Sequence, residues 1–93
     1  MKYEWDEEKA ASNLKKHGVG FDDAATVFDD LFYVDFYDPK HSTQEHRFLI
    51  VGESDRQRLL IVSYTERDDK IRIISARELM PQERRNYEHG KYE

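Results

Sequence analysis

Two arginines near the end of the chain stand where a charged side chain is costly. Arg72 and Arg77 flank residues 73–76, a mostly apolar stretch that is typical of a buried β-strand. An arginine out of water needs an anionic partner, which is either a structural carboxylate or a phosphate that arrives with a substrate. In a regular strand, residues five apart point to opposite faces, so we expect the two arginines on opposite sides. For either one alone, a structural salt bridge to a carboxylate such as Glu45 or Glu83 is the default interpretation.

A wider set of charged residues would suit the cleavage of RNA without a metal. In that reaction the 2′-hydroxyl attacks the adjacent phosphate, which requires a base, an acid and cations around the developing charge. The candidates for acid–base work are Glu45, His46 and His17, and the candidate cations are Arg47, Arg67, Arg72 and Arg77. The same residues would equally suit a salt-bridged binding module that performs no chemistry.

No motif for a metal or a nucleotide accompanies these residues. His41 and His46 lie five apart in a polar segment without a second pair of ligands, which is typical of solvated loop histidines. The four glycines stand singly, so there is no glycine-rich phosphate loop, and no G-x-S-x-G sequence is present. The absence of cysteine excludes thiolate zinc sites and cysteine nucleophiles. We therefore expect neither a metal nor a cofactor.

Composition and charge limit the partners of the chain. Its 93 residues predict one domain over 1–93, and a net charge of −5 disfavours a general nucleic-acid binder. All eight arginines, however, fall within residues 45–93, where a local anion site can still form. No apolar run approaches the roughly 20 residues that span a bilayer, and no signal peptide is evident. With no cysteine, we expect a cytoplasmic protein without a membrane partner.

The pattern of apolar residues predicts the elements that position these side chains. A short strand at 3–5 is followed by a helix from Asp6 to His17, whose Lys16 and His17 suit the negative end of the helix dipole. A second helix over 21–30 carries an apolar stripe of Ala24, Val27, Phe28 and Leu31. Strands are predicted at 31–37, 46–53, 58–65 and 70–77, and a last helix begins at Pro81. The short turns imply an antiparallel meander, so the order predicts an α+β domain.

Several stretches, taken together, resemble the BrnT family of bacterial toxins. They are WDEEKAASNLKKHGVGFDDAATVF (5–28), EHRFLIVG (45–52), RLLIVSYTER (58–67) and IRIISARELMPQERRNYE (71–88). Each stretch is common by itself, whereas their joint order and spacing over nearly the whole chain are specific.

The resemblance implies a RelE-like fold and a metal-independent ribonuclease that blocks translation by cleaving RNA. It also implies neutralisation by a cognate BrnA-type antitoxin, whose ribbon-helix-helix domain binds operator DNA. The family's marked positions correspond here to Lys16, His17, Glu45, Arg47, Arg67, Arg72, Ser75 and Arg77. As catalytic candidates we take His17, Glu45, Arg47, Arg67, Arg72 and Arg77, and as RNA-binding candidates Lys16, Arg47 and Arg72. The alternative is a non-catalytic subunit with a toxin fold, which acts only as a protein-binding or co-repressor partner.

Overall fold

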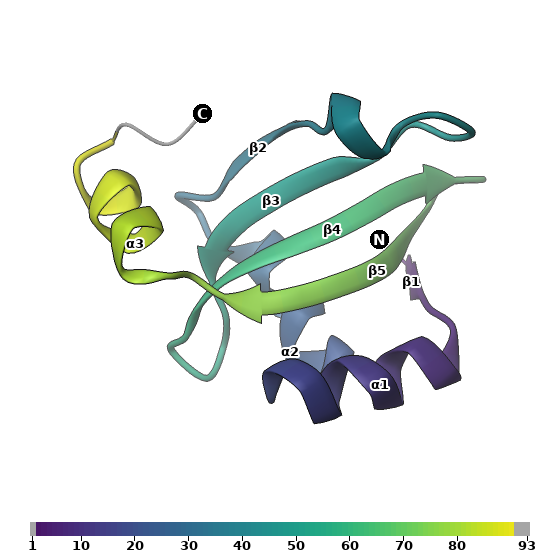
Figure 1. Ribbon diagram of the computed structural model, residues 1–93, viewed down its shortest axis with the longest axis horizontal. Coiled ribbons are helices and arrows are strands. Elements are labelled where there is room, and N and C mark those ends of the chain that lie inside the picture. The colour runs from purple at the N-terminus through teal and green to yellow at the C-terminus, as the bar shows by residue number, and fades with distance from the viewer. Residues whose placement is uncertain (1, 91–93) are drawn as a thin grey trace.

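The computed structural model describes residues 2–90, which form one five-stranded sheet with α2 against one face, α1 along the β5 edge and α3 beyond one end (Figure 1). The elements along the chain are β1 (Lys2–Glu4), α1 (Glu7–His17), α2 (Phe21–Ala25), η1 (Thr26–Asp29), β2 (Val34–Tyr37), η2 (Pro39–His41), β3 (Phe48–Glu53), β4 (Leu59–Arg67), β5 (Lys70–Glu78) and α3 (Pro81–Glu88). The predicted α+β class is confirmed, and β1 joins the four predicted strands in the same sheet. Among the described residues, none of the helices has the length and apolar character that a bilayer crossing demands.

The first helix begins and ends at the residues that the sequence predicts. The Asp6 carboxylate accepts hydrogen bonds from the backbone N–H groups of Glu8, at 2.8 Å, and Lys9, at 3.0 Å. These two bonds satisfy donors that the first turn of a helix leaves without partners. Gly18 then takes the left-handed conformation, with φ 69°, and its N–H donates to the Leu14 carbonyl. A residue with a Cβ is disfavoured there, so the glycine ends the helix.

The second predicted helix is shorter and tighter than its apolar stripe suggests. After Ala25 the α-helix gives way to the 3₁₀ helix η1, which ends at Asp29. Ala24 and Val27 are fully buried, and the Phe28 ring packs against the rings of Tyr3 and Tyr64. The stripe prediction is wrong for Leu31, which is 92% exposed, because the helix ends before it and the chain turns toward β2.

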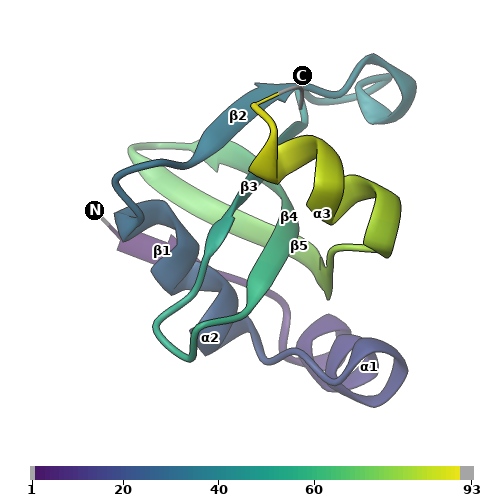
Figure 2. The same ribbon diagram turned by 90° about the vertical axis from the view of Figure 1, so that its left-hand side faces the viewer.

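The sheet has the order β1-β5-β4-β3-β2 and buries its core against α2. Strands β2 to β5 pair antiparallel, as the short turns predict, whereas β1 pairs parallel with β5. The side facing α2 contributes Ile50, Leu60, Val62 and Ile73 to the core. Figure 1 looks onto the opposite side, which we call the open face, and Figure 2 shows α2 and α3 on opposite sides of β3 and β4.

A β-bulge changes which side chains of β5 reach the open face. Tyr64 of β4 pairs with Ile73 and Ser63 pairs with Ser75, so Ile74 is an extra residue in β5. An extra residue inverts the alternation of side chains beyond it. Ile73 and Ala76 therefore both lie in the core. It follows that Arg72 and Arg77 share the open face, and the prediction that they point to opposite sides is wrong.

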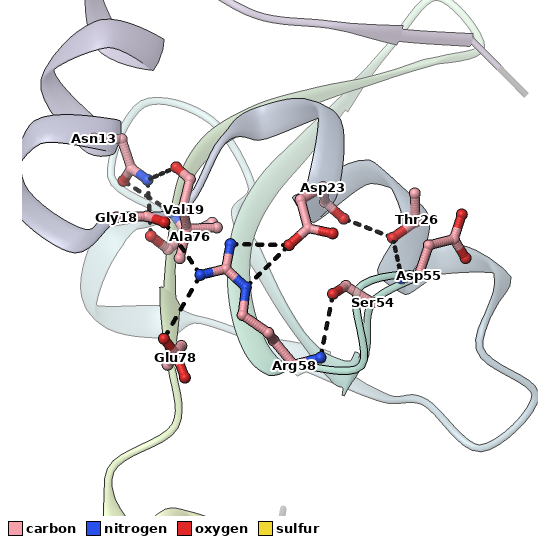
Figure 3. A network of polar contacts seen from close by, with 10 residues as sticks. All are labelled: Asn13, Gly18, Val19, Asp23, Thr26, Ser54, Asp55, Arg58, Ala76 and Glu78. Atoms are coloured by element: carbon pink, nitrogen blue, oxygen red, sulfur yellow. Dashed lines mark hydrogen bonds and ion pairs between the residues drawn. The ribbon is translucent and has the colours of Figure 1, made fainter.

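Asn13 attaches α1 to the free edge of β5 (Figure 3). Its side-chain amide donates to the carbonyls of Val19, at 3.0 Å, and Ala76, at 2.8 Å, and its oxygen accepts from the Ala76 N–H at 3.1 Å. Strand β1 pairs only with residues 70–72, so at Ala76 this side chain takes the place of a neighbouring strand. The buried backbone groups of β5 are thereby satisfied beyond the end of β1.

A second polar network holds the β3–β4 turn against α2 (Figure 3). The Arg58 guanidinium donates from Nε and Nη2 to Oδ2 of Asp23, whose side chain is almost fully buried. Its Nη1 donates to the Gly18 carbonyl and lies 3.6 Å from the Glu78 carboxylate. Arg58 is therefore a structural arginine, which stabilises the fold at a distance from the open face.

Candidate active site on the open face of the sheet

The strand register places a row of polar residues across one end of the open face. Glu4 pairs with Arg72, and Arg72 pairs with Thr65. One residue before β3, the Arg47 carbonyl accepts the Asp38 N–H, which extends the pairing of β2 with β3. The row therefore runs from Glu4 on β1 through Arg72, Thr65 and Arg47 to Asp38 after β2. Arg47 and Arg72 are two of the predicted site residues.

Two arginines contact Glu45 at this end of the face and a third acts on it through its charge; we call Arg47, Arg67 and Arg72 the arginine cluster. Arg67 donates from Nη2 to the Glu45 carboxylate at 2.6 Å, and the Arg47 Nε lies 3.9 Å from the same carboxylate. Arg72 donates to Glu4 at 3.3 Å and contributes to the electrostatic field at Glu45. Four of the predicted site residues are thus brought together from the loop before β3, from β4 and from β5.

The pairing with Arg67 stabilises the ionised form of Glu45. The hydrogen bond from Arg67, aided by the charges of the three arginines, holds the pKa of the Glu45 carboxyl below its usual range. The same contact raises the pKa of Arg67. A carboxylate stabilised in its ionised form is a weak proton acceptor at neutral pH. In this arrangement Glu45 acts as a counter-ion of the arginines more readily than as a base.

Arg47 has the least complete set of partners in the arginine cluster. Its Nε is buried and makes no hydrogen bond within residues 2–90, and its ion pair with Glu45 is long. A buried donor without a partner is unfavourable in a folded protein. The Arg47 side chain is 30% exposed as a whole, so an anion would meet its terminal nitrogens and not the buried Nε.

A shallow groove on the open face begins at Arg47 and extends toward α3. It is lined by His17, Asp38, His41, Arg47, Leu49, Ile61, Ser63, Ile74, Ser75, Ala76 and Arg77. Residues from α1, from the 38–47 loop and from three strands therefore meet in one concavity. Arg47 belongs both to this groove and to the arginine cluster, so the two form one continuous site.

Arg77 occupies the end of the groove and is tied to α3. Its two terminal nitrogens donate to the two Glu83 carboxylate oxygens at 2.7 and 2.9 Å. Glu83 also accepts the Met80 N–H at 2.8 Å, and the Tyr87 hydroxyl donates to the Phe32 carbonyl. Arg77 thus fixes the position of α3, which has no buried residue of its own.

The remaining predicted residues lie around the rim. His17 is an exposed residue of the last turn of α1 and lines the groove, as does Ser75. Lys16 is exposed beside His17 and does not line the groove. His46 lines a second hollow with Glu45 and Arg67, and its Nδ1 lies 3.2 Å from the Tyr37 hydroxyl. Within residues 2–90, no group of three or more histidine, aspartate or glutamate side chains could hold a metal ion.

Comparison with known proteins shows the family and the fold of the chain. A family profile described as "Ribonuclease toxin, BrnT, of type II toxin-antitoxin system" matches residues 5–83. This chain belongs to the BrnT family. Among solved structures, the ribonuclease toxin BrnT of Brucella abortus superposes with a TM-score of 0.64 at 24% sequence identity. The match covers 86% of this chain and 97% of the Brucella chain, and at that identity it shows a shared fold. No curated protein gave a significant match.

In this member of the BrnT family, one pair of residues in the groove was not predicted from the sequence. His41 Nδ1 lies 2.8 Å from Oδ2 of Asp38, and the two residues line the groove together with Arg47 and Arg77. In the sequence, the two residues are three positions apart, and Asp38 precedes Pro39. That pattern indicates a turn and gives no sign of a catalytic pair. Their proximity to the arginines depends on how the loop folds back over β3.

Proposed function

We propose that this BrnT-family chain is a metal-independent endoribonuclease that blocks translation by cleaving RNA. The observation that carries the proposal is the arginine cluster, continuous through Arg47 with a groove that holds two histidines. Arginines can neutralise a phosphate and stabilise the charge that develops on it. The histidines can exchange protons near neutral pH. Membership of a family of ribonuclease toxins supports the same reaction.

In this proposal, an RNA phosphate competes with Glu45 and Glu4 for the arginines. Arg67 is about half exposed and Arg72 about one-third exposed, so both ion pairs are accessible from the solvent. Exposed ion pairs contribute little to stability, about 0–1 kcal/mol, and a bidentate phosphate contact can replace them. The carboxylates keep the arginines in position while no RNA is bound. Lys16 and Arg72 would then contact the RNA backbone beside the cleaved bond.

The partner that we propose is a BrnA-type antitoxin with a ribbon-helix-helix domain. Support comes from the family, whose members are toxins of type II toxin–antitoxin systems. The chain itself has a net charge of −5, which disfavours direct binding to duplex DNA. Operator DNA would therefore be reached only through the antitoxin. The protein is expected to act in the cytoplasm, where its RNA substrate and translation are found.

The test is cleavage of RNA by the purified protein in the presence of excess EDTA. We expect fragments from total RNA, and we expect growth to stop when the chain is expressed without an antitoxin. Co-expression with a ribbon-helix-helix protein encoded beside it should restore growth. Cleavage that disappears with EDTA and returns with a divalent ion would refute the metal-independent mechanism. Normal growth at confirmed soluble expression, together with intact RNA, would refute the ribonuclease.

One observation favours the alternative, a non-catalytic subunit with a toxin fold. Arg67, Arg72 and Arg77 each already form an ion pair with a carboxylate of the chain. If those pairs are permanent, these three arginines are not available to the RNA, and the open face serves mainly as a protein surface. Capture of a basic protein partner by a wild-type chain that leaves RNA intact would favour this function.

A further inference from the structure

We propose that His41, oriented by Asp38, is the general base that activates the 2′-hydroxyl of the RNA. This inference rests on the ribonuclease function proposed above and deepens it. It starts from the contact of His41 Nδ1 with Asp38 Oδ2 at 2.8 Å. When the carboxylate is ionised it can only accept a hydrogen bond, so Nδ1 is the donor in this contact. In the neutral ring the lone pair is then on Nε2, the atom that can take up a proton.

Burial distinguishes the two members of this pair. The Asp38 side chain is 11% exposed, whereas the His41 side chain is 63% exposed. The carboxylate is therefore held inside the loop, and the imidazole is accessible to a ligand in the groove. A buried carboxylate that orients an accessible histidine fixes the tautomer and stabilises the imidazolium that forms on proton uptake. Asp38 would thus be a positioning residue, and His41 the group that touches the substrate.

The loop around the pair is fastened by its own hydrogen bonds. The Asp38 N–H donates to the Arg47 carbonyl at 2.9 Å. Ser42 Oγ donates to the Asp38 carbonyl at 2.6 Å and accepts the Arg47 N–H at 2.9 Å. These bonds close the loop over residues 38–47 and keep His41 on the same rim as Arg47. The candidate base therefore lines the same groove as Arg47.

The other acid–base candidates are less suitable as the base. Glu45 is engaged by two arginines, at 2.6 and 3.9 Å, which favour its ionised form. His46 lines a separate hollow. The remaining ionisable groups on the wall of the groove are His17 from α1, Arg47 from the loop and Arg77 from β5. His17 is exposed in the last turn of α1 and lines the same groove, so its position suits a proton donor.

The proposed step is a transesterification that needs no other reagent. His41 Nε2 takes the proton of the 2′-hydroxyl while the 2′-oxygen forms a bond to the adjacent phosphorus. The bond from phosphorus to the 5′-oxygen breaks, and that oxygen takes a proton from the His17 imidazolium. Arg47 stabilises the charge on the phosphate oxygens. The products are a 2′,3′-cyclic phosphate and a 5′-hydroxyl end.

The experiment measures RNA cleavage by wild-type protein, His41→Ala, Asp38→Asn and His89→Ala. His89 is an exposed histidine that follows α3 and does not line the groove, so it is the matched control. We expect His41→Ala to lose about 10²–10⁴ of the cleavage rate, the range typical of general acid–base catalysis. Asp38→Asn should lose less, and His89→Ala should cleave like the wild type. Free imidazole should restore part of the activity of His41→Ala.

Two further measurements distinguish catalysis from folding or binding. Wild-type cleavage should increase with pH on the acidic side of its profile, and this increase should be absent in His41→Ala. Affinity for an uncleavable RNA with 2′-deoxy nucleotides should be equal in the two proteins. Cleavage by His41→Ala at the wild-type rate would overturn the role of His41 and leave the ribonuclease function standing. Equal losses of cleavage and of affinity would do the same. Intact RNA with the wild-type protein would overturn the ribonuclease function and this inference together.

Discussion

Replacement of Arg72 and Arg77 by lysine should separate a phosphate-binding arginine from a structural one. A lysine keeps the positive charge but cannot donate two parallel hydrogen bonds to one anion. Arg72 makes a single contact with Glu4 at 3.3 Å, and both side chains are 31% exposed. Arg77 makes two shorter contacts with Glu83 and connects β5 to α3. The same substitution is therefore expected to have different effects at the two positions.

The contacts give the size of each effect. Loss of one partly exposed ion pair at Arg72 should change the free energy of unfolding by at most about 1 kcal/mol, and a lysine can retain part of it. A charged hydrogen bond contributes about 1.5–3 kcal/mol when buried, and partial exposure of Arg77 and Glu83 reduces this to roughly 1–2 kcal/mol. In a domain of this size, about 1 kcal/mol lowers Tm by about 4–8 °C. Arg77→Lys should therefore lower Tm measurably, and Arg72→Lys should leave Tm nearly unchanged.

The assay combines thermal melting, RNA cleavage and growth after expression of each variant. We expect Arg72→Lys to reduce cleavage and toxicity at nearly constant Tm, and Arg77→Lys to reduce all three. An equal loss of stability in the two variants would refute the role of Arg72 in phosphate binding. Full activity of Arg72→Lys would refute that role as well. A structural contact that lysine can also make would then account for the arginine at position 72.

Three other predictions concern the fold and Glu45. Asn13→Ala should lower the free energy of unfolding by about 2–3 kcal/mol, because it leaves buried backbone groups of Ala76 without partners. Urea denaturation measures this loss, and a loss below about 0.5 kcal/mol would show that β5 does not depend on the Asn13 side chain. Phe28→Ala should cost roughly 3 kcal/mol, since it removes a ring packed against Tyr3 and Tyr64, and a wild-type Tm would contradict that packing. The lowered pKa of Glu45 means that its ion pair with Arg67 stabilises the fold above the ordinary carboxyl pKa, and that this contribution disappears as pH decreases through the lowered value. The difference in Tm between wild type and Glu45→Gln should therefore be largest at neutral pH and vanish in acid; a constant difference would argue against the pair.

The local elements follow from the sequence because their causes are local. The Asp6 cap, the Gly18 terminus and the alternating apolar strands depend on residues a few positions apart. Leu60, Ile61 and Val62 are buried, so both alternating sets of this apolar stretch are covered, as befits β4 in the middle of the sheet. Errors appear where tertiary packing decides, as at Leu31, which lies on a helical stripe in the sequence but beyond the end of η1 in the structure.

For the candidate site, too, part could be inferred from the sequence and part required the tertiary structure. The residue types of the arginine cluster, and the membership of the chain in a ribonuclease toxin family, could be inferred from the sequence, because they depend on identity and order. Which side of the sheet each arginine occupies could not be inferred, since the bulge at Ile74 exists only through the pairing of β5 with β4. The contact of His41 with Asp38, and its place beside Arg47, likewise require the loop to fold back over β3. Side-chain alternation is a property of one strand, whereas register, bulges and loop closure are properties of two segments in contact, and only the tertiary structure brings those segments together.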